Sequence, residues 1–171
     1  GGKTHTLITL RHLHHDPTSL PQLAAVAEFV EEIGETPTRA KVVGLCFDKI
    51  DVETPIEARG PNGEERKLLQ PWSFLAYQLL GDEGLKILEK DGKAEERQSP
   101  PSEMLITKLL EAATENGDGV LILLDEVIAY ARQKVNLDKK WEGIMEDFFQ
   151  FLTQAASKTN LCCVVASILA S

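Results

Sequence analysis

Residues 119–126 read Gly-Val-Leu-Ile-Leu-Leu-Asp-Glu, an apolar run that ends in two carboxylates. A short, unbroken run of aliphatic side chains predicts a strand that is buried on both faces of a sheet. In a parallel sheet, ligands bind at the edge formed by the carboxyl ends of the strands. The segment therefore predicts an α/β fold in which Asp125 and Glu126 lie at a ligand-binding edge.

Helical and strand-like segments alternate along the rest of the chain, which predicts a three-layer αβα fold with a mainly parallel sheet. Apolar runs and turn residues predict further strands at Lys41–Phe47 and Leu161–Ala166. The polar stretch Asp51–Lys67, with Pro61-Asn62-Gly63 as a turn, predicts either a surface hairpin or an irregular excursion. Apolar periodicity and capping residues predict helices at Thr4–His15, Pro21–Ile33, Pro71–Lys90 with a break near Gly81–Gly84, Ser102–Glu115, Ile128–Lys134 and Lys140–Ser157.

Composition narrows the class of protein. The chain has 171 residues, of which 43% are hydrophobic, so one domain with a real core is expected. The formal net charge of -9 argues against a segment that binds nucleic acid unaided, since phosphate contacts need clustered Lys and Arg. No membrane span or export signal is evident, and three cysteines without a framework fit a reducing cytoplasm. The cysteines fall in apolar strands and are expected to be core residues.

The start of the chain resembles half of a phosphate-binding loop. Gly2-Lys3-Thr4 followed at once by a helix is the end of the pattern GxxxxGK[ST]. Backbone N–H groups at Gly1 and Gly2 and at the helix N-terminus, with His5 in the first turn, would cradle phosphate. Lys3 would reach the β- and γ-phosphate oxygens, and the Thr4 hydroxyl would bind Mg²⁺.

The strand that ends at Asp125 supplies the second half of the predicted site. Asp125 would hold the Mg²⁺ directly or through water, and Glu126 would act as the general base that activates water. Neither motif is specific alone, because Asp125 and Glu126 could simply cap the next helix and Lys3 could be a solvated lysine. Together they predict a nucleotide-binding domain that uses ATP and Mg²⁺.

The two motifs resemble the Walker A and Walker B boxes of P-loop NTPases, in the additional-strand branch that includes the AAA+ proteins. That resemblance implies a polar sensor residue after the next strand, and Ser167 in Leu161-Cys-Cys-Val-Val-Ala-Ser167 is the candidate. It also raises Arg132 as a candidate arginine finger acting in a neighbouring subunit. More narrowly, GGKTHTLITLRHL (1–13) with LLDEVIAYAR (123–132) is similar to large ATP-binding proteins encoded in prokaryotic phage-defence loci.

The resemblance also implies how the chain is divided. Residues 1–171 would be a partial P-loop ATPase domain: 1–50 would hold the Walker A end and the second strand, 51–101 an insertion, and 102–171 the Walker B and sensor region. The chain opens inside the phosphate loop, so the first strand is expected to precede Gly1. We therefore expect this piece alone to be inactive and to bind ATP weakly or not at all.

The predicted function is Mg²⁺-dependent ATP hydrolysis that drives conformational change in a larger, defence-associated protein. A nucleotide-gated switch or scaffold with slow turnover remains an alternative, and a small-molecule kinase is a weaker one. The resemblance implies a homo-oligomer or defence-complex partners, with DNA contact through regions outside this chain and no membrane. A metal site at His12 and His15 is disfavoured, because no second cluster completes it.

Overall fold

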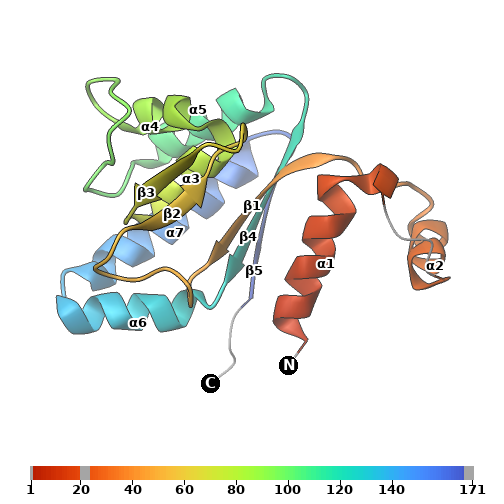
Figure 1. The fold of residues 1–171 in the computed structure, drawn as a ribbon, viewed down its shortest axis with the longest axis horizontal. Helices are drawn as coiled ribbons and strands as arrows, with labels where there is room; N and C mark the ends of the chain where they lie inside the picture. The colour runs from red at the N-terminus through yellow and green to blue at the C-terminus, as the bar shows by residue number, and fades with distance from the viewer. Residues whose placement is uncertain (1, 20–23, 168–171) are drawn as a thin grey trace.

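A computed structural model describes residues 2–19 and 24–167, which form a mixed α/β fold around a parallel sheet (Figure 1). Strands β1 (Ala40–Cys46), β4 (Gly119–Asp125) and β5 (Cys162–Ala166) pair in the order β1-β4-β5, and both pairings are parallel. The three strands predicted for this sheet are confirmed, with small shifts at their ends. Because β4 is the central strand, its carboxyl end lies between those of its two neighbours.

The larger core fills one face of the sheet. Helices α3 (Pro71–Leu80), α5 (Glu103–Thr114) and α7 (Trp141–Lys158) pack there. Ser102 caps α5, as predicted, by accepting a hydrogen bond from the N–H of Leu105. Aromatic side chains anchor α7: Phe148 is fully buried and contacts the rings of Trp72 and Phe149.

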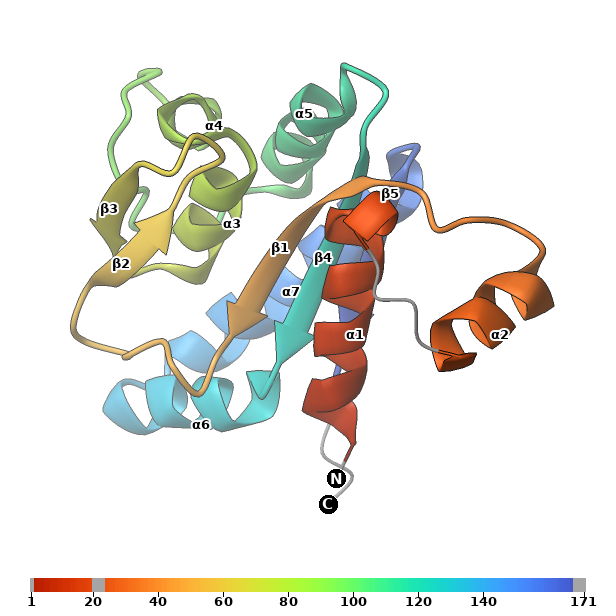
Figure 2. The same cartoon turned by 45° about the vertical axis from the view of Figure 1, so that its right-hand side comes forward.

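Helix α1 (Lys3–His15) covers the opposite face of the sheet (Figure 2). Its Leu7 packs against Leu121 and Leu123 of β4, whereas the alternate β4 side chains point into the larger core. Burial of β4 on both faces explains why residues 119–124 are apolar without alternation. The helices on both faces agree with the predicted αβα arrangement.

The predicted surface hairpin is confirmed, and it joins the core through a pair of short helices. Strands β2 (Ile56–Arg59) and β3 (Glu65–Leu68) are antiparallel, and the chain continues into α3 and then α4 (Asp82–Leu88). The break between α3 and α4 falls where the sequence predicts it. Gly81 has φ +61°, and a Cβ on Gly84 would overlap the carbonyl group of Ala76.

Helix α2 (Ala24–Ile33) differs from the others because it stands to one side of the sheet (Figures 1 and 2). It follows a short 3-10 turn, η1 (Pro17–Ser19). Its sequence has an apolar stripe, but Phe29 is 39% and Ile33 44% exposed. The predicted start of this helix at Pro21, and Leu23 on its apolar face, lie outside the described residues.

A buried lysine, Lys134, links α6 (Val127–Leu137) to the loop after β1 through a hydrogen bond. Nζ of Lys134 donates a hydrogen bond to the carbonyl oxygen of Val52 at 2.5 Å and lies 4.4 Å from the centre of the Trp141 ring. Burial lowers the pKa of the Lys134 ammonium. The aliphatic stem and the buried head of this lysine therefore contribute to packing rather than to the solvated surface.

Within the described ranges, no helix is long and apolar enough to cross a membrane, as the sequence predicts.

Two phenylalanines test which helices the core depends on. Phe148→Ala should lower the free energy of unfolding by about 3–5 kcal/mol, because it leaves a cavity in the larger core. Phe29→Ala on α2 should cost less than about 1 kcal/mol, since that ring is partly exposed. Urea denaturation measures both values, and equal losses would contradict the assignment of α2 to the periphery.

Candidate functional site

The carboxylate of Asp125 is the centre of the site at the carboxyl edge of the sheet. It is the last residue of β4 and only 6% exposed. The Thr4 hydroxyl donates a hydrogen bond to its Oδ2 at 2.9 Å, and the Ser167 hydroxyl donates a short one to its Oδ1. Three of the predicted site residues, from the beginning, middle and end of the chain, therefore meet at one carboxylate.

The sheet and α1 together bring these groups into contact. Helix α1 runs against the direction of the strands, so its N-terminus lies at their carboxyl edge (Figure 2). Ser167 follows β5 directly, and its N–H donates to the carbonyl of Leu124, which continues the strand ladder by one residue. Parallel pairing of β4 with β5 thereby sets Ser167 beside Asp125.

The N-terminus of α1 has no side-chain cap. Gly2 occupies the N-cap position without a side-chain cap, and the first turn holds no acidic residue. Lys3 and His5 are exposed, and the His5 carbonyl accepts a hydrogen bond from Thr9. Uncapped N–H groups with a nearby lysine favour an anion at this position. The predicted contribution of Gly1 lies outside the described residues.

Glu126 has an unusual backbone. It is one of two non-glycine residues with positive φ in the described chain, with φ 55° and ψ 32° at the N-cap position of α6. Its side chain makes no capping hydrogen bond to α6, and Asp125 is engaged by Thr4 and Ser167 instead. The alternative that these two carboxylates serve as helix caps therefore finds no support in the contacts. Left-handed backbone at a bulky residue is typical of functional sites.

The three cysteines differ in burial, whereas the sequence predicts that all of them are core residues. Cys46 is the neighbour of Asp125 in the register of β1 and β4. Burial, together with a hydrogen bond to Asp48, raises the pKa of the Cys46 thiol to about 11. Burial also raises the pKa of Cys162 to about 11. The expectation that all three are core residues is wrong for Cys163, which is exposed on β5.

The remaining predicted candidates stay apart from this site. Among the described residues, at His12 and His15 as elsewhere, no group of three or more His, Cys, Asp or Glu could hold a metal ion. Arg132 is exposed on α6, and its role as an arginine finger stays a prediction.

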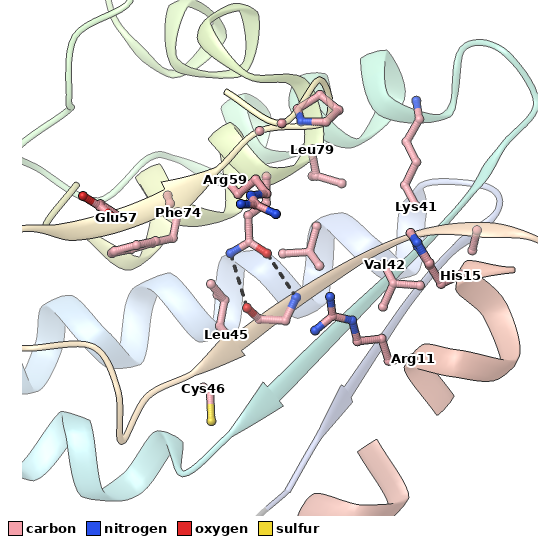
Figure 3. A pocket seen from close by; sticks show the side chains of 18 of the residues that line it. Arg11, His15, Lys41, Val42, Leu45, Cys46, Glu57, Arg59, Phe74 and Leu79 are labelled. Atoms are coloured by element: carbon pink, nitrogen blue, oxygen red, sulfur yellow. Dashed lines mark hydrogen bonds between the residues drawn. The ribbon is translucent and has the colours of Figure 1, made fainter. Parts of the chain in front are cut away.

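Sequence reasoning missed a pocket of about 880 Å³ beside the outer edge of β1 (Figure 3). None of the predicted site residues lines it. Its charged lining includes Arg11 of α1, Arg39 and Lys41 at the start of β1, and Arg59 of β2. These residues are scattered along the chain, so no local motif could have revealed them.

Fold and site define the class: an α/β protein with an open parallel sheet and a carboxylate–hydroxyl site at its carboxyl edge. The chain matches the model of the DUF499 N-terminal domain over residues 1–171, and it belongs to that family. No curated protein and no solved structure matches the chain.

Thr4→Val tests the link between α1 and Asp125. The substitution keeps the shape of the side chain but removes one of two hydroxyl donors to a buried carboxylate, which should cost about 1–3 kcal/mol of unfolding free energy. Thr153→Val is the matched control, because the hydroxyl of Thr153 bonds only within α7. Urea denaturation should give a loss below about 0.5 kcal/mol for the control. Equal losses would rule out a special role for the tertiary bond.

Thiol titration tests the cysteine environments. At pH 8, thiols with a pKa of about 11 are about 0.1% ionised, so Cys46 and Cys162 should react slowly with an aromatic disulfide reagent. Exposed Cys163 should react first, and Cys163→Ser should remove the fast phase. Raising the pH from 8 to 10 should speed the slow phases by about 100-fold, since the thiolate fraction rises tenfold per pH unit below the pKa. A fast phase that survives Cys163→Ser would contradict this order.

Proposed function

We propose that this domain binds ATP with Mg²⁺ and takes part in its hydrolysis. The observation that carries the proposal is the hydrogen bond between Thr4 and Asp125, 121 positions apart in the sequence. It joins an uncapped helix N-terminus, which attracts phosphate, to a carboxylate that can hold a cation. A nucleoside triphosphate carries both partners that these two groups prefer, the polyphosphate and its bound metal.

The residues present fit Mg²⁺. The ion prefers hard oxygen ligands and is usually bound by one or two protein oxygens, with water and substrate phosphates completing the shell. The Thr4 hydroxyl donates a hydrogen bond to Asp125, and its oxygen keeps lone pairs for a cation. The ion would neutralise negative charge on the phosphate oxygens. Thr4 and Asp125 would hold it, and Ser167 would orient the Asp125 carboxylate.

Lys3 and Glu126 have separate roles in this proposal. Lys3, exposed in the first turn of α1, would extend its ammonium group toward the terminal phosphates. Glu126 follows the metal-binding carboxylate directly, and its side chain is not used to cap α6. It would accept a proton from the attacking water. Binding of nucleotide alone needs no such base, so this residue favours hydrolysis over a slow switch or scaffold.

Wider roles follow from the same proposal. Three of them rest on the resemblance of 1–13 and 123–132 to the large ATP-binding proteins of phage-defence loci. They are conformational work in a larger defence-associated protein, assembly into a homo-oligomer or with defence-complex partners, and DNA contact by other regions. They are proposals about the whole protein.

A pair of substitutions in the full-length protein tests the assignment. Lys3→Ala should abolish ATP binding measured by calorimetry. Glu126→Gln should preserve binding but lower the rate of phosphate release about 10²–10⁴-fold, because the amide cannot act as a base.

Exposed residues on α5 provide the controls. Lys108→Ala and Glu111→Gln remove the same charges away from the site and should leave binding and turnover unchanged. Parental turnover in Glu126→Gln would show that Glu126 is not the base. Parental ATP affinity in Lys3→Ala would remove the basis for a phosphate site at α1.

A further inference from the structure

The pocket beside β1 gathers positive charge in an acidic protein. Five of the 18 Lys and Arg residues line it, against only Glu57 and Asp118 among the carboxylates. Arg59 is paired with Glu65 at 2.9 Å. By contrast, Arg11, Arg39 and Lys49 form no ion pair with any residue in the described part of the chain. The pocket therefore attracts a ligand that brings carboxylates or other anionic groups.

The floor of the pocket is a strand edge. Among residues 2–19 and 24–167, β1 pairs with β4 alone, and Ala40, Val42 and Gly44 line the pocket along its other edge. Gly44 both donates to and accepts from the Gln78 carboxamide, each at 3.3 Å (Figure 3). The side-chain amide thus imitates one peptide group of a missing neighbouring strand. By the alternation of a strand, the backbone groups of Ala40 and Val42 face the same edge.

We propose that the outer edge of β1 binds an extended acidic peptide segment of a partner protein. The segment would add to the sheet as a further strand and displace the Gln78 amide, whose two bonds are near the long limit for hydrogen bonds. Backbone pairing would supply affinity, and the cationic side chains would select for carboxylates. In Figure 3, Arg11 and Arg59 reach toward this edge from α1 and β2, on either side of β1.

A peptide fits this pocket better than a nucleic acid. The main-chain donors and acceptors of Ala40, Val42 and Gly44 face the outer edge of β1 in alternation, which matches a peptide backbone that repeats donor and acceptor groups along its length. A nucleic acid would bring a dense, unbroken row of phosphates close to Glu57 and Asp118. Among Phe, Tyr and Trp, the pocket lining contains only Phe74, which is buried, and the one other aromatic ring in the lining is that of His15, so the lining offers no row of aromatic side chains for stacking successive bases.

This proposal is independent of ATP binding. The pocket excludes Lys3, Thr4, Asp125, Glu126 and Ser167, so a peptide site can exist whether or not the carboxylate site binds nucleotide.

The test uses a fluorescein-labelled heptapeptide of alternating Glu and Val, with a Lys-Val heptapeptide as the charge control, and the full-length protein. Fluorescence anisotropy should show saturable binding of the Glu-Val probe only. Binding should also slow hydrogen exchange of the backbone amides in 40–46. Two further probes carry N-methyl groups on either the Glu or the Val amides. Because alternate amides of a strand face opposite sides, one of them should lose binding and the other should keep it.

Substitutions locate the site. Arg11→Ala combined with Lys49→Ala should weaken binding about three- to tenfold, whereas Lys93→Ala with Lys108→Ala, on exposed residues elsewhere, should have no effect. Gln78→Ala frees Gly44 and should strengthen binding about two- to fivefold, with Gln150→Ala as its control. Four results would each overturn the proposal: weaker peptide binding by Gln78→Ala, unchanged hydrogen exchange in 40–46, equal binding of the two N-methyl probes, or a preference for a single-stranded oligonucleotide over the Glu-Val peptide.

Discussion

The hydrogen bond from Thr4 to Asp125 is the interaction on which the arrangement of the site depends. It fixes the N-terminus of α1 at the carboxyl edge of the sheet, while Leu7 anchors the middle of the same helix on β4. A helix held at both points cannot slide along the sheet without leaving a buried carboxylate short of a donor. That penalty, of order 1–3 kcal/mol, is a substantial fraction of the roughly 5–15 kcal/mol by which a typical domain is stable.

The site at Asp125 and the pocket beside β1 differ in their local charge. The carboxylate site lies where three chain segments converge on one acidic group, and an exposed lysine, Lys3, stands in the first turn of the helix that reaches it. The pocket beside β1 instead collects cations from α1, β1 and β2. A net charge of -9 describes neither environment, because long-range fields average over the surface whereas binding responds to the groups within a few ångströms.

Local patterns were sufficient to predict most of the elements. The apolar run at 119–124, the proline–glycine turn of the hairpin and the Gly81–Gly84 break each encode backbone preference in neighbouring residues, and the structure confirms all three. The apolar stripe of α2 predicts a helix but not its partner, since periodicity identifies an apolar face without saying what covers it. The burial of Cys163 was predicted wrongly for a related reason. Strand β5 lies at the edge of the described sheet, where an apolar sequence does not ensure that each side chain is covered.

Most of the helices and strands, and the position of Asp125 and Glu126 after a buried strand, can be predicted from the residues alone, because these properties depend on short-range sterics and hydrophobic periodicity. Three features became known from the packed fold alone: Thr4 and Ser167 share one carboxylate, Glu126 takes a left-handed backbone, and distant cations gather at the free edge of β1. Those features arise from strand order and helix packing, which bring together groups that have no local relation in the chain.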